Sequence, residues 1–164
     1  MPDRAHAITL SDGVTYFENP PRFLNATTSQ DGTYIWGATY YFTISIPDNA
    51  GEPLKTIVIQ QESGASRAVF DPNKVAAFEG TRDRSGEEIP IQDVSFDARS
   101  QAISVIFDPP IDPGKTLTLR FYPVRNPGIG GRYLYGITAF PLGEQPYGQF
   151  LGYGEISIYD SQED

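Results

Sequence analysis

The sequence is poor in residues that build covalent or metal-centred chemistry. Its 164 residues include no cysteine and a single histidine, His6. Without cysteine there are no disulfide bonds and no thiolate ligands, so the folded chain must be held by packing alone. A transition-metal site needs several nitrogen or sulfur ligands, and a Ser-His-Asp triad needs a firmly held histidine. We therefore expect no transition metal, no such triad and no cofactor.

Long apolar runs and positive charge are also scarce. No stretch approaches the ~20 apolar residues of a membrane-spanning helix. The first ten residues lack the apolar core of an export signal, so such a signal is absent from this sequence. The 12 Lys and Arg against 21 Asp and Glu give a formal net charge of −9. Such a charge repels phosphate backbones, and we expect no nucleic-acid partner and no transmembrane segment.

Turn residues and strand patterns are abundant. Sixteen Gly and 14 Pro indicate many turns. Apolar residues recur at every second position, which is the period that places side chains on one face of a sheet. The segments with this strand pattern are residues 34–46, 56–61, 89–96, 103–107, 116–122, 133–139 and 153–159.

One helix and one exposed tip are also predicted. Asp71 suits a helix N-cap, Pro72 suits the first helical position and Gly80 lies just beyond the end, so we expect a short helix over residues 71–78. The charged segment 82–88 has a central glycine and predicts an exposed loop or hairpin tip.

These patterns predict an all-β fold, an immunoglobulin-like antiparallel β-sandwich with one short helix. We expect an N-terminal arm with the first strand or strands over residues 1–19, a single sandwich domain over 20–159 and a disordered tail over 160–164. Trp36, Tyr40 and Phe42 share the even positions of one strand and are predicted to lie in the core.

Several short motifs carry a family resemblance. They are the residues 107–114 (FDPPIDPG), 116–119 (TLTL), 125–127 (RNP), 131–133 (GRY) and 139–141 (AFP). In this combination the chain resembles, over roughly residues 20–159, a cyanobacterial family known as domain of unknown function 2808. Members usually carry an export signal, so the resemblance implies the periplasm, the thylakoid lumen or the cell exterior. It implies no established activity and supplies no catalytic residues.

Two groups of residues are candidate binding sites. Arg125 and Asn126 precede a glycine-rich loop, where an arginine fork can hold a carboxylate or phosphate group; the alternative is a structural turn in which Asn126 bonds the backbone and Arg125 pairs with an acidic side chain. Tyr34, Tyr147 and Tyr153 are candidates for an exposed aromatic platform.

Oxygen-rich positions leave two further alternatives. Asp108 and Asp112 are candidate calcium ligands, although Asp at a proline corner commonly caps a turn. Paired carboxylates would be needed for a glycoside hydrolase, and Glu62, Glu79, Glu144 and Glu155 are available for such a pair, although the favoured interpretation is that they are solvated surface groups.

Taken together, these features favour a non-enzymatic, extracytoplasmic binding or structural module. We expect it to interact with a protein at the cyanobacterial envelope or thylakoid lumen, where it could associate peripherally with a membrane complex. Two alternatives remain open: a carbohydrate-binding module that uses exposed tyrosines, and a calcium-stabilised surface protein.

Overall fold

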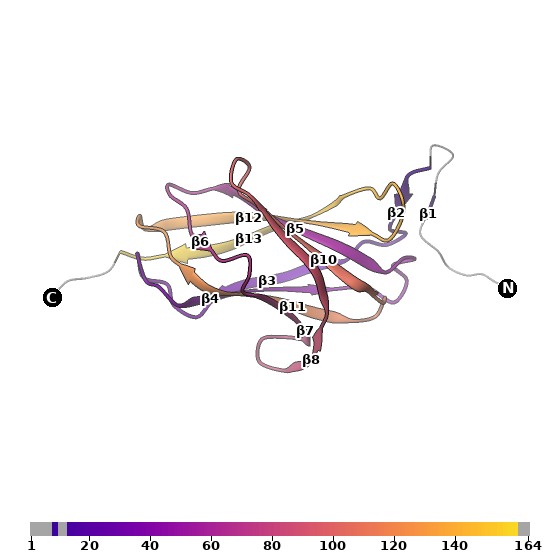
Figure 1. Ribbon diagram of the computed structural model, residues 1–164, viewed down its shortest axis with the longest axis horizontal. Helices are drawn as coiled ribbons and strands as arrows, with labels where there is room; N and C mark the ends of the chain where they lie inside the picture. Colours follow the sequence, from indigo (N-terminus) through magenta and orange to yellow (C-terminus); the bar gives the residue numbers. More distant parts are fainter. Residues whose placement is uncertain (1–7, 10–12, 161–164) are drawn as a thin grey trace.

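The structure is a computed structural model that describes residues 8–9 and 13–160 (Figure 1). The described residues form thirteen strands and no helix. Two large antiparallel sheets lie face to face, and a small ribbon of β1 (Ile8–Thr9) and β2 (Thr15–Tyr16) lies at one end. The predicted immunoglobulin-like antiparallel β-sandwich is confirmed, whereas the division into arm, domain and tail stays a prediction.

The first sheet has five strands. In spatial order they are β13 (Gln149–Ile158), β12 (Gly131–Pro141), β5 (Leu54–Ser63), β10 (Ala102–Ile111) and β9 (Ile91–Asp97). The second sheet has six strands. Its main path is β3 (Arg22–Thr28), β4 (Ala38–Ser45), β11 (Thr116–Arg125), β7 (Val75–Gly80) and β8 (Ser85–Ile89), and β6 (Val69–Phe70) also pairs with β11.

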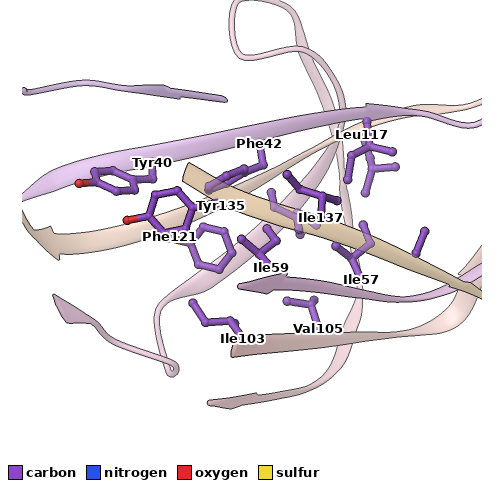
Figure 2. Packing of buried hydrophobic residues seen from close by; sticks show 14 of the residues in the cluster. Tyr40, Phe42, Ile57, Ile59, Ile103, Val105, Leu117, Phe121, Tyr135 and Ile137 are labelled. Atoms are coloured by element: carbon purple, nitrogen blue, oxygen red, sulfur yellow. The ribbon is translucent and has the colours of Figure 1, made fainter. Parts of the chain in front are cut away.

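The core lies between the sheets and is filled by alternate residues of both (Figure 2). Tyr40 and Phe42 of β4 are fully buried, as predicted. Phe42 makes edge-to-face contacts with Phe121 of its own sheet and Tyr135 of the facing sheet, with ring centroids 5.7 and 5.8 Å apart. Aromatic pairs in this geometry add about 0.5–1.5 kcal/mol each beyond the burial of their area. They join the two layers of the sandwich.

The prediction that Trp36 lies in the core is wrong. Its side chain is 60% exposed. The strand begins only at Ala38, and the residue between them, Gly37, has φ +90. This left-handed conformation turns the chain, so the alternation that buries Tyr40 does not extend back to Trp36.

The predicted helix over residues 71–78 is also wrong. Asp71 accepts a hydrogen bond from the backbone N–H of Asn73 at 2.9 Å, which is a turn, and β7 begins at Val75. Strand β7 pairs with β11 along its length, so long-range pairing overrides a short local helix signal. The charged segment 82–88 forms the exposed tip and second strand of the β7–β8 hairpin, which confirms the prediction made for it.

The chain changes sheets at a proline within the segment predicted as one strand over residues 89–96. Ile89 ends β8 in the second sheet, Pro90 follows, and Ile91 begins β9 in the first sheet. Of the predicted tail, only Asp160 is described; its carboxylate accepts a hydrogen bond from the N–H of Gly130 at 3.1 Å. Residues 161–164 and His6 lie outside the described residues.

A buried amide connects the core to the loops at one end. Asn126 is fully buried, and its Oδ1 accepts a hydrogen bond of 2.7 Å from the hydroxyl of Tyr40. Its Nδ2 donates to the carbonyls of Gln30 and Gly32, both at 2.8 Å. One side chain thus satisfies a core hydroxyl and holds the β3–β4 loop against the β11–β12 loop.

Substitution of a core aromatic residue should lower the free energy of unfolding far more than substitution of the exposed tryptophan. We expect Phe42→Ala to lower the free energy of unfolding by about 3–5 kcal/mol, since it removes a buried ring and leaves a cavity. Trp36→Ala should cost less than about 1 kcal/mol, which is the scale of an exposed cation–π contact. Urea unfolding of both variants measures the difference. Equal losses of unfolding free energy would contradict the placement of Phe42 in the core and Trp36 at the surface.

Loss of the Asn126 amide should destabilise the chain more than loss of the Tyr40 hydroxyl. Asn126→Ala leaves a buried hydroxyl and two loop carbonyls without their partner, at a cost of about 1–3 kcal/mol for a buried group of this kind. Tyr40→Phe removes the hydroxyl alone and is the matched control. In urea unfolding, Asn126→Ala should lose more unfolding free energy than Tyr40→Phe. An Asn126→Ala variant as stable as the parent would show that the amide is not needed for stability.

Stability should fall at alkaline pH. Burial, with a smaller contribution from Tyr133, raises the pKa of Tyr40, and burial also raises the pKa of Tyr135. Both groups keep their protons to higher pH in the folded chain than in the unfolded chain, where a tyrosine ionises near pH 10.0. Their contribution is therefore complete below about pH 10 and is lost as the pH rises above it. Unfolding midpoints measured across this range should decline for the parent chain and decline less for Tyr135→Phe.

Candidate functional site

A group of exposed apolar residues lies at the end of the sandwich where strand β13 ends, on the left in Figure 1. Its apolar side chains come from three segments, which are the β3–β4 loop, the β11–β12 loop and the residue after β13, and the last residue of β11 adds an arginine. We call this surface the aromatic end. It consists of Tyr34, Trp36, Ile129 and Tyr159, each at least 50% exposed, together with Arg125.

Backbone hydrogen bonds join these segments. The N–H of Tyr34 donates to the carbonyl of Pro127 at 3.2 Å, and the N–H of Asn126 donates to the carbonyl of Ile35 at 2.9 Å. Tyr159 donates its N–H to the carbonyl of Asp31 at 2.7 Å. The exposed side chains therefore stand on a loop backbone that hydrogen bonds hold to the β11–β12 loop and to the end of β13.

The ring of Tyr34 is held in place by an unusual backbone conformation and a glycine. Tyr34 has φ 63, in the left-handed region that a non-glycine residue rarely adopts. Its ring covers Gly128, where a Cβ atom would come within 2.5 Å of the ring. A side chain at position 128 would displace the tyrosine. Sites that hold strained backbone in this way are often functional.

Arg125 lies beneath the tryptophan. Its guanidinium carbon is 5.7 Å from the centre of the Trp36 ring, in cation–π contact. Arg125 forms no ion pair with any residue that the structure describes, and its buried Nε has no hydrogen-bond acceptor among them. Among the described residues Arg125 thus has no acidic partner, and it lies beside the aromatic surface of Trp36.

The predicted site residues fall in three separate places. Arg125, Asn126 and Tyr34 come together at the aromatic end, although the Asn126 amide is buried and occupied by internal hydrogen bonds. Tyr147 lies near the opposite end, stacked on Tyr16 of β2 with ring centroids 4.8 Å apart. Tyr153 lies on β13, in edge-to-face contact with Phe150 at 5.1 Å.

The acidic candidates do not form a cluster. Asp108 and Asp112 are both exposed, and no group of three or more His, Cys, Asp or Glu among the described residues is placed to hold a metal ion. Glu79 forms an ion pair with Lys115 at 3.0 Å, and Glu155 lies 3.7 Å from Arg132. These two carboxylates are neutralised at the surface by neighbouring cations.

Three members of the aromatic end were not among the predicted site residues: Trp36, Ile129 and Tyr159. For two of them the sequence carries a local signal. Trp36 is followed directly by Gly37, and Ile129 stands between Gly128 and Gly130, so both apolar side chains belong to turns and not to strands.

Solved structures with a similar fold include two bacterial pilins. The major pilin subunit BcpA of Bacillus cereus, in its D312A variant, has a TM-score of 0.56 and 13% identity over 87% of this chain and 41% of that one. The 35 kDa C-terminal fragment of the major pilin GBS80 of Streptococcus agalactiae has a TM-score of 0.52 and 10% identity over 86% of this chain and 56% of that one. This chain thus spans about half the length of these structures, and the likeness concerns the fold alone.

The remaining findings concern membrane-spanning helices, relatives among curated proteins and the family of the chain. None of the described residues belongs to a helix long and apolar enough to cross a lipid bilayer. A search of curated proteins finds no significant relative. A family match, by contrast, covers residues 14–158, which is most of the sandwich. By this match the chain belongs to the family described as Protein of unknown function (DUF2808).

Proposed function

We propose that this protein is a non-enzymatic, extracytoplasmic module that binds a protein partner through its aromatic end. The observation that carries the proposal is the exposure of Tyr34, Trp36, Ile129 and Tyr159 on segments whose backbones are hydrogen-bonded to one another, with the guanidinium of Arg125 in contact with Trp36. Tryptophan, tyrosine and arginine are the residues that most often dominate protein–protein binding energy.

The setting of these residues supports a protein interface. Large exposed apolar side chains are ordinary when scattered, but these four stand on three segments that backbone hydrogen bonds bring together at one end, and grouped apolar exposure of this kind marks interaction sites. The hydrogen bonds of the loop backbone and of Asn126 hold the patch in shape before binding. A preorganised surface loses little conformational entropy when a partner docks.

The arrangement of the remaining tyrosines favours a protein over a sugar ligand. A sugar platform would need exposed rings that lie in one plane beside polar groups. Instead, Phe150 and Tyr153 meet at an interplanar angle of 68°, and the rings of Tyr16 and Tyr147 cover each other's faces. The fold analogy points the same way, since the similar structures include pilin subunits, but fold likeness by itself carries no function.

The proposed location is the cyanobacterial envelope or the thylakoid lumen, in peripheral association with a membrane complex. The family resemblance supports this compartment. The net charge of −9 supports a partner of opposite overall charge, because opposite potentials steer association. Fractionation of cells of the source organism, with detection of the native protein, tests the compartment; recovery in the cytoplasm would refute it.

The binding proposal is tested by quantitative capture from an envelope extract of the source organism. The baits are the parent chain, Trp36→Ala and, as a matched aromatic control on β13, Tyr153→Ala. We expect one protein to be retained in stoichiometric amount by the parent and the control. Trp36→Ala should retain at least about tenfold less, since loss of a central interface tryptophan commonly costs about 2 kcal/mol or more.

Unfolding midpoints verify that all three baits are folded, and reconstitution with the purified partner verifies direct binding. Equal retention by Trp36→Ala and the parent would refute the aromatic end as the interface. A stabilising response to added calcium, with no protein retained, would support the calcium alternative in its place.

A further inference from the structure

A second candidate site, chemically different from the aromatic end, is a hollow on the outer face of the six-stranded sheet. It is bounded by strands β4, β11 and β7 and by the β7–β8 hairpin, and its volume is about 350 Å³. This is within the range of small-ligand sites. The side chains that matter for its chemistry are those of Tyr41, Ala76, Phe78, Arg82, Glu88 and Arg120.

The register of the sheet explains why the hollow exists. Tyr41, Arg120 and Ala76 are directly opposite one another on neighbouring strands and so form one cross-strand row. The short side chain of Ala76 leaves room beside Arg120, while Phe78 stands two residues further along the same strand and face. The floor of the hollow is therefore part of a regular sheet and is rigid.

Two guanidinium groups border this hollow without an acidic partner. Arg82 lies over the ring of Tyr41, 4.4 Å from its centre, and donates from Nη1 to the hydroxyl of Thr27 at 3.3 Å. Arg120 is exposed, and neither arginine forms an ion pair with any described residue. The side chains that line the hollow include these two arginines and one glutamate, so the hollow carries more positive than negative charge in a chain where acidic residues outnumber basic ones by 21 to 12.

The side chains that line the hollow limit the chemical class of ligand that it can bind. A guanidinium group binds a carboxylate through two parallel hydrogen bonds. Glu88 lines the same hollow and only accepts hydrogen bonds, so it favours hydroxyl donors and repels a second negative charge. Tyr41 and Phe78 add aromatic surface. The matching ligand has one carboxylate, several hydroxyls and an apolar face.

We propose that this hollow binds a hexuronate unit of an acidic polysaccharide, with the sugar carboxylate on Arg82 and Arg120 and hydroxyl groups on Glu88. The site shares no residue with the aromatic end and goes beyond the proposed protein-binding function. Each can fail without the other.

The test is calorimetric titration of the full chain with an oligogalacturonate, and with its carboxyl-reduced, neutral counterpart at the same length. We expect the acidic oligosaccharide to bind, with an affinity that falls as salt rises, and the neutral one to bind at least about tenfold more weakly. Arg120→Gln should weaken binding of the acidic oligosaccharide at least about tenfold, because it removes the charge but keeps a polar side chain.

Two controls make the outcome specific. Arg132→Gln removes an exposed arginine on β12, outside the hollow, and should leave the affinity unchanged. Trp36→Ala should also leave it unchanged, which separates this site from the aromatic end. The proposal is overturned if the oligogalacturonate does not bind, if Arg120→Gln binds like the parent, or if an oligoglutamate peptide binds with equal affinity.

Discussion

Aromatic packing between the two sheets is the constraint on which the other features of this chain depend. With no cysteine available, the sandwich is held by side chains alone, and Phe42, Phe121 and Tyr135 lock its two layers edge to face. Rings of this size bury much apolar area and accept few orientations. They therefore set the spacing and alignment of the sheets, and through these the positions of the loops at either end.

Asn126 connects the core to the surface loops through hydrogen bonds. Tyr40 is part of the core, yet its hydroxyl must find a partner, and the partner is an amide that also binds two carbonyls of the β3–β4 loop. A buried polar network of this kind stabilises only when every member is satisfied. The same three hydrogen bonds that satisfy the core thus hold the loop that presents Tyr34 and Trp36 to solvent.

The molecule offers two surfaces of different chemistry on this one scaffold. The aromatic end is apolar with a single guanidinium, and loops build it. The hollow beside Arg120 is polar; strands form its floor and the β7–β8 hairpin forms one side of it. A loop-built patch suits a macromolecule that makes broad contact, whereas a strand-built hollow suits a small, fixed ligand group.

The sequence by itself determined the fold class and much of the core. Alternation at Tyr40 and Phe42 is a local property of a half-buried strand, and the charged segment 82–88 has no apolar face to bury. Tertiary structure alone decided the rest. Pairing with β11 made a strand where Asp71 and Pro72 suggested a helix, and the turn at Gly37 exposed Trp36. The convergence of residues 34, 36, 125, 129 and 159 depends on which loops meet at one end, and that depends on contacts between strands far apart in the chain, which no local pattern encodes.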